Sequence, residues 1–272
     1  MMIYLVLLFP VVGYGLYRLL RYFLDKRTQQ RRENLIAESF PEAWRQWLIA
    51  DFPLYQKLPV DLQLKLEGHI KVFVDEKVFV GCAGFEITDE VKVLIAAQAC
   101  ILILNTGDDY FPGFETILVY PETYVASETH QEGVLHTNTV SARAGESWHR
   151  GPVIVAWDQV VRGAQDERDG HNVVMHEFAH KLDEQNHRMD GLPVLADRSQ
   201  YKSWAEVLSK EYERLCHHHD DVIDAYGATS AAEFFAVVTE TFFEKPAQLK
   251  KKHPELYQQF RLYYQLDPVL WQ

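Results

Sequence analysis

The chain has 272 residues, 47% of them apolar, and a formal net charge of −12 at pH 7. This apolar fraction is too high for a disordered chain and is sufficient for a well-buried domain. The acidic balance argues against nucleic-acid binding, which needs a basic face.

An apolar run opens the chain. Residues 2–17 carry no charge, and apolar residues continue to residue 24 around Arg18 and Arg21. A membrane-spanning helix needs about 20 apolar residues, and arginines near its end can reach the interface. A cleaved signal peptide fits less well, because no basic segment precedes the run and no small-residue cleavage site follows it. We therefore expect one N-terminal transmembrane helix at residues 1–24.

Basic residues follow this run. Residues 25–33 read as a polar juxtamembrane linker that contains Lys26, Arg27, Arg31 and Arg32. The positive-inside rule places such a flank in the cytoplasm. We expect a single-pass protein of the inner (cytoplasmic) membrane, with a domain at residues 34–272 facing the cytoplasm. Three cysteines without C-x-x-C spacing suit that reduced compartment.

The rest of the chain alternates between patterns of helices and strands. Apolar periodicity predicts helices at 34–50, 60–74, 89–104, 199–218 and 254–265, and strands at 77–80, 116–120 and 152–157. Polar residues 127–147 read as a hairpin or loop. These elements predict an α+β, zincin-like fold that is mainly helical with a small sheet. In such folds, an edge strand such as 152–157 can hold an extended peptide by strand addition.

The strongest motif is His176-Glu177-Phe178-Ala179-His180. Two histidines four residues apart share one face of a helix, so both rings can reach one Zn²⁺. The glutamate between them is placed to act as a general base, as in H-E-x-x-H zinc peptidases. A surface helix with ordinary histidines is the alternative interpretation.

A catalytic zinc needs a third protein ligand. The extended metzincin motif is absent, and His187 lies one residue out of its register. The triplet at residues 217–219 follows a charged helix and reads better as a solvated helix end. Asp183, one turn after His180, either orients a ligand imidazole or is a plain surface carboxylate.

A better candidate for the third ligand is Glu233. It follows Ser230 by three residues, as in a capping box, and opens a helix rich in aromatic residues. A carboxylate on a buried helix is costly unless it is paired or bound to metal. Glu240, seven residues later on the same face, is the reserve ligand or a partner of a ligand histidine.

Two family resemblances rest on these segments. The stretch from Tyr226 to Phe235 resembles the third-ligand segment of anthrax lethal factor-type zinc peptidases. The stretches Gly81–Glu90, Ile95–Cys100, Gly145–Trp148 and Arg168–Asp183 resemble the Mlc titration factor A family, bacterial zinc-dependent peptidases linked to regulation of glucose uptake. The resemblance implies that His176, His180 and Glu233 bind zinc, that Glu177 is the base and that Tyr226 assists catalysis.

Two functions remain open. In the first, the protein hydrolyses peptide or protein substrates with a zinc-bound water activated by Glu177, and Tyr226 stabilises the oxyanion. In the second, it is a protein-binding regulator with weak or no catalysis, because the family's namesake sequesters a transcriptional repressor. An intact Glu177 favours the enzyme, since a purely structural zinc has no use for a base.

Overall fold

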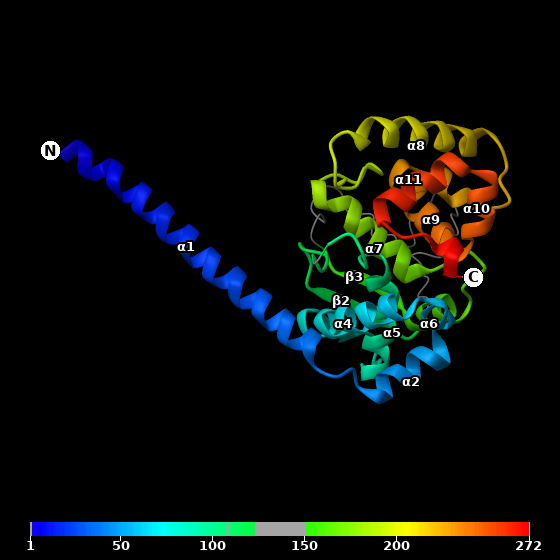
Figure 1. Ribbon diagram of the computed structural model, residues 1–272, viewed down its shortest axis with the longest axis horizontal. Coiled ribbons are helices and arrows are strands. Elements are labelled where there is room, and N and C mark those ends of the chain that lie inside the picture. Colours follow the sequence, from blue (N-terminus) through cyan, green and yellow to red (C-terminus); the bar gives the residue numbers. More distant parts are fainter. Residues whose placement is uncertain (1, 108, 123–150, 272) are drawn as a thin grey trace, which may run out of the picture.

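Helices make up most of the chain in the computed structural model, which describes residues 2–107, 109–122 and 151–271 (Figure 1). The α-helices of this described part are α1 (Met2–Ala37), α2 (Glu42–Asp51), α3 (Pro53–Lys57), α4 (Val60–Glu76), α5 (Asp89–Ile101), α6 (Trp157–Gln165), α7 (Val173–Asp183), α8 (Gln200–His217), α9 (Ala231–Glu244), α10 (Pro246–Lys252) and α11 (Pro254–Tyr264). Short 3₁₀ turns are η1 (Glu184–Asn186), η2 (Ala225–Ala228) and η3 (Pro268–Trp271).

Three short strands form one parallel sheet. The strands are β1 (Val78–Gly81), β2 (Thr116–Tyr120) and β3 (Val153–Ala156), in the order β1-β2-β3. Val78 pairs with Thr116, and Ile117 pairs with Val153. The strands lie close to the predicted positions, while the predicted hairpin or loop at 127–147 falls outside the described residues.

The fold is mainly helical with a small sheet, as predicted, but the arrangement of the sheet needs one correction. The sheet is wholly parallel, and α5 forms the crossover from β1 to β2, so helices and strands are not segregated as in an α+β fold. Parallel neighbours need a connection of a dozen or more residues, usually through a helix. The pattern of apolar residues along one strand does not indicate whether the neighbouring strand runs parallel or antiparallel to it, so the sequence did not predict this arrangement.

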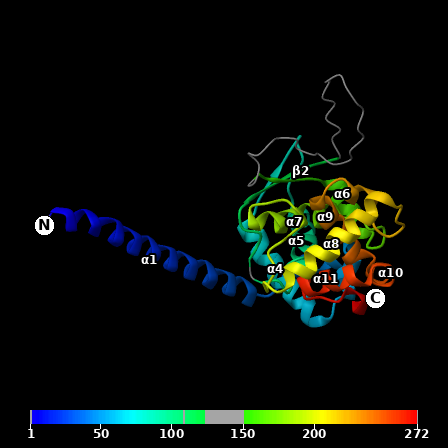
Figure 2. The ribbon, with the colours of Figure 1, turned by 90° about the horizontal axis from the view of Figure 1, so that it is seen from above.

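The N-terminal helix extends away from the rest of the protein in both views (Figures 1 and 2). It runs without a break through residues 25–33 to Ala37. Its last turns pack on the body, where Arg31 and Arg32 pair with Asp75 and Glu76 at the end of α4, at 2.6 and 2.7 Å. The large apolar side chains from Tyr14 to Leu24 are more than half exposed.

The predicted membrane anchor is wrong. Among the helices that the structure describes, none combines the length and the apolar character needed to cross a bilayer. In α1, Arg18 and Arg21 interrupt the apolar residues, and the same helix continues into a charged segment from Asp25. The expected single-pass location in the inner membrane, with the domain facing the cytoplasm, therefore loses its support.

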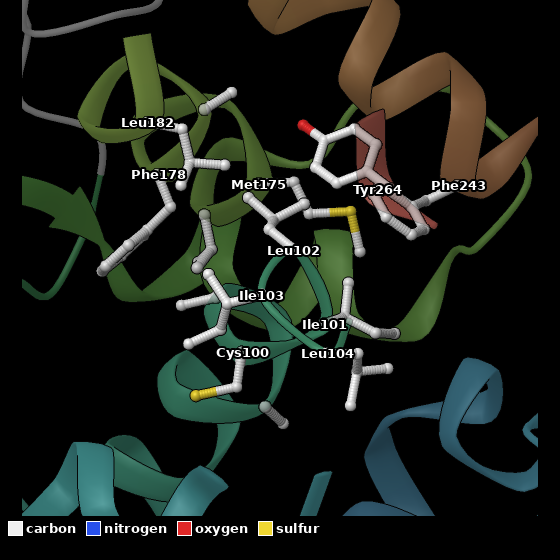
Figure 3. Packing of buried hydrophobic residues seen from close by; sticks show 14 of the residues in the cluster. Cys100, Ile101, Leu102, Ile103, Leu104, Met175, Phe178, Leu182, Phe243 and Tyr264 are labelled. Atoms are coloured by element: carbon white, nitrogen blue, oxygen red, sulfur yellow. The ribbon is translucent and has the colours of Figure 1, made fainter. Parts of the chain in front are cut away.

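Helix α7 lies between the N-terminal helices α2–α6 and the C-terminal helices α8–α11 (Figure 1). One of its faces is in the core, where Met175, Phe178 and Leu182 lie near the end of α5 and the C-terminal helices (Figure 3). The Phe178 ring lies 4.8 Å from the ring of Phe111 and 5.5 Å from that of Phe73, measured between centroids. Burying such a side chain contributes about 2–3 kcal/mol, so the rotation of α7 is fixed by its core face.

Candidate metal centre

The N-terminus of α7 is held by Asn172. The Asn172 side chain accepts a hydrogen bond from the Met175 N–H at 3.0 Å and donates to the Gly163 carbonyl at 2.9 Å. Its own N–H donates to the carboxylate of Glu240 on α9. A cap that also bonds α9 fixes both where α7 begins and how it faces its neighbour.

His176 and His180 lie one above the other on α7, as their spacing predicts. Their Nε2 atoms are 3.2 Å apart, and both residues are at least nine-tenths buried. The Nδ1 of His176 lies 2.8 Å from Glu240 Oε1. Because a carboxylate can only accept, this Nδ1 carries the proton, and in the neutral ring the Nε2 lone pair faces His180.

Glu233 completes a group of three. It lies in the first turn of α9, where its N–H donates to the Oγ of the N-cap residue Ser230 at 3.2 Å. Its Oε2 lies 2.9 Å from His176 Nε2 and 3.5 Å from His180 Nε2. The carboxylate is directed to the histidines, and the three ligand atoms lie within 4.8 Å of one another.

This arrangement fits a zinc ion. Two imidazole nitrogens and one carboxylate oxygen are the usual donors of a catalytic zinc site, which keeps one position open. The buried Oε2 of Glu233 has no well-aligned hydrogen-bond partner despite its closeness to both rings. Donor atoms of these types that converge so closely are suited to a shared cation.

Charge couples the three groups. Burial alone would lower the pKa of His176, but the carboxylates of Glu233 and Glu240 raise it to about 10. Burial alone would raise the pKa of Glu233, but His176 and His180 lower it to about 2. The carboxylates therefore favour the protonated form of His176, and the histidines favour the ionised form of Glu233.

Glu177 and Tyr226 lie beside this group. Glu177 follows His176 on α7 and is half-buried, and burial raises the pKa of its carboxyl above the usual range while the two histidines oppose that change. Tyr226 lies in η2, where its N–H donates to Asp224 Oδ1 at 2.8 Å. Its ring centroid is 6.1 Å from that of His176.

The other candidates lie elsewhere or have other partners. His187 follows η1 with a left-handed φ of 67°, and residues 217–219 lie at the exposed end of α8. Neither belongs to the described cluster of metal-binding groups. Asp183 is fully buried and accepts a hydrogen bond from the Gly191 N–H, and burial raises its pKa to about 6.

Comparison with known proteins identifies the family. The sequence matches the family described as glucose-regulated metallo-peptidase M90 over residues 26–265. The chain belongs to this family.

Relatives of this M90 chain match over most of its length. An uncharacterized protein of Synechocystis sp. is 42% identical over 246 residues, which cover 88% of this chain and 90% of that protein. Mlc titration factor A of Cronobacter sakazakii is 34% identical over 250 residues, covering 88% and 91%. Mlc titration factor A of Klebsiella pneumoniae is 34% identical over 237 residues, covering 83% and 86%.

These matches confirm the predicted resemblance to the Mlc titration factor A family, and M90 membership indicates a metallopeptidase that uses a metal. The similarity of the Tyr226–Phe235 segment to lethal factor-type peptidases stays a prediction. The structure adds Asn172, which the sequence analysis missed as a site residue. The sequence could have indicated its role, because Asn172 directly precedes the helix with the apolar periodicity, and asparagine is common at the N-cap position.

Proposed function

We propose that this chain is a zinc-dependent metallopeptidase whose metal is held by His176, His180 and Glu233. The observation that carries the proposal is the convergence of two buried imidazole Nε2 atoms and one carboxylate oxygen within 4.8 Å. Membership of a metallopeptidase family supports it. The donor set of two nitrogens and one oxygen favours zinc.

The chain's own side chains divide the work of hydrolysis. Zinc, when bound, acts as a Lewis acid that polarises a carbonyl and lowers the pKa of a water. Glu177 accepts a proton from the attacking water and passes it to the leaving amine. Tyr226 donates a hydrogen bond to the substrate oxygen as negative charge develops there. Glu240 keeps the His176 ring in the orientation in which Nε2 faces the ligand group.

The sheet offers a place for an extended peptide substrate. Among the described residues, β3 pairs only with β2 and is an edge strand of the sheet. The same segment leads through α6 towards α7, and β3 packs against α7. An extended peptide added to this edge would gain backbone hydrogen bonds without a demand for one particular sequence.

Glu177→Gln tests the proposal. Glutamine keeps the size of the side chain but cannot accept the water proton, so we expect full zinc content and a loss of peptide hydrolysis of at least about 100-fold. The measurements are metal analysis and cleavage of a fluorogenic peptide library by the full chain. The matched control is Glu206→Gln, on an exposed position of α8, which should behave as wild type.

A regulator is the second candidate, because relatives carry the name Mlc titration factor A. In that reading, the chain binds a transcriptional repressor and hydrolyses little or nothing. Unchanged hydrolysis in Glu177→Gln would contradict the peptidase mechanism. Stoichiometric binding of a repressor by both wild type and Glu177→Gln, with no cleavage by either, would favour the regulator.

A further inference from the structure

Contacts through the loop residue Gly191 connect α7, which carries the two histidines, to α9, which carries Glu233. Asp183 is the last residue of α7, one turn after His180, and its Oδ2 accepts the Gly191 N–H at 2.8 Å. Asp183 is fully buried, so it holds this loop residue from inside the protein. The end of α7 is thereby tied to one peptide unit of the following loop.

Gly191 in turn contacts the first residue of α9. Its φ is +73°, in the left-handed region that favours glycine, and a Cβ built there would lie 2.5 Å from the Ala231 carbonyl oxygen and 3.0 Å from its carbonyl carbon. The loop backbone therefore lies directly against the first turn of α9. Ala231 is two residues before Glu233, so any displacement of this contact moves the proposed zinc ligand.

The other side of Gly191 is also held. Trp204 on α8 donates from Nε1 to the Gly191 carbonyl at 3.1 Å. The indole is buried, stacks on Phe260 with centroids 5.4 Å apart and lies 6.0 Å from the Phe235 ring of α9. Both hydrogen-bonding groups of Gly191 are thus satisfied by buried side chains that belong to other elements.

We propose that Gly191, fixed between Asp183 and Trp204, is a spacer that sets the position of Glu233 relative to His176 and His180. Asp183, Gly191 and Trp204 are positioning residues, since none of them belongs to the ligand group. The inference rests on the proposed zinc site. It explains why a fully buried carboxylate at the end of α7 is directed to a loop N–H.

Gly191→Ala is the direct test, with Gly84→Ala as its matched control. Gly84 has a similar φ of +81°, but a Cβ there has no neighbour within 4 Å. We expect Gly191→Ala to weaken zinc binding by about 10–100-fold in chelator competition, the usual range for residues that orient metal ligands. The visible spectrum of the Co²⁺-loaded protein should also change, whereas Gly84→Ala should match wild type in both measurements.

A second set of variants keeps the test decisive if Gly191→Ala does not fold. Asp183→Asn retains an oxygen acceptor for the Gly191 N–H and should keep wild-type zinc affinity, while Asp183→Ala removes it and should weaken binding. Trp204→Phe removes the indole donor together with part of the buried ring and should weaken binding in the same direction. Wild-type affinity and Co²⁺ spectra in Gly191→Ala would overturn the spacer. If that variant does not fold, wild-type values in both Asp183→Ala and Trp204→Phe would overturn it.

Glu233→Ala separates this inference from the proposed function. If Glu233→Ala retains full zinc content, the proposed metal site is wrong and the spacer has nothing to position. If Glu233→Ala loses zinc while the spacer variants bind it as wild type does, the metal site stands and only the spacer is wrong.

Discussion

Glu240 Oε1 lies 2.8 Å from His176 Nδ1, and both side chains are buried. The second oxygen of the same carboxylate accepts the N–H of Asn172, the N-cap residue of α7. One carboxylate on α9 therefore fixes both the ring orientation of a proposed ligand and the start of the helix that carries it.

Glu240→Gln should weaken zinc binding by about 10–100-fold. One oxygen of the glutamine can still accept from His176, but its amide group then faces the Asn172 N–H, donor against donor. Chelator competition measures the affinity. Glu255→Gln, which replaces an exposed carboxylate on α11, serves as the control. An unchanged zinc affinity in Glu240→Gln would show that the His176 ring needs no such partner.

Tyr226→Phe should lower kcat by about 100-fold while KM changes by less than about threefold. The phenol is proposed to donate to the substrate oxygen as charge develops, so its loss affects the transition state more than the bound substrate. Steady-state kinetics on a cleaved peptide measure both constants. Tyr22→Phe on the exposed part of α1 is the control. A large rise in KM at constant kcat would instead assign Tyr226 to substrate binding.

Asp183→Asn should stabilise the metal-free protein above pH 6. Burial raises the pKa of Asp183 to about 6, against an ordinary value of 3.8. The folded state then binds more protons than the unfolded state between about pH 4 and pH 6, so this group costs stability as the pH rises through that window. Asparagine removes the buried charge and keeps an acceptor for Gly191.

Urea unfolding at pH 3.5, 5 and 7 measures this effect. The two proteins should have similar free energies of unfolding at pH 3.5, and the variant should gain up to about 3 kcal/mol at pH 7. A variant less stable than wild type at pH 7 would mean that the Asp183 carboxylate is ionised and stabilising in the folded protein.

Removal of residues 1–24 should leave zinc content unchanged and the melting temperature within about 2 °C of wild type. The described side chains from residue 13 to residue 24 are exposed, and no proposed ligand lies there. Removal of residues 1–37 should lower the melting temperature by about 4–8 °C, because it deletes the pairs Arg31–Asp75 and Arg32–Glu76 and the packing of Ile36 against Gly68. Calorimetry of the two truncated chains measures the difference, and equal melting temperatures would contradict the role assigned to the last turns of α1.

Sequence reasoning succeeded where the information is local. The i, i+4 spacing alone places His176 above His180, and the strand patterns lie within a few residues of β1, β2 and β3. Sequence reasoning could not predict contacts between residues that lie in different elements. The bond from Asp183 to Gly191 depends on how the loop after α7 packs, and the parallel sheet depends on a crossover that no single strand encodes. The end of helix α1 was predicted wrongly, because residues 25–33 are charged but contain no proline or glycine that would end the helix there.

A metal bound to His176, His180 and Glu233 would also join distant parts of the chain, since the whole of α8 lies between its ligands. An ion that binds only the folded state stabilises it in proportion to the logarithm of its free concentration over the dissociation constant. The fraction of molecules open to attack by cellular proteases would then rise when zinc is scarce. Zinc supply would thus govern how long each copy of the protein survives in the cell, so that starvation for the metal removes the protein itself.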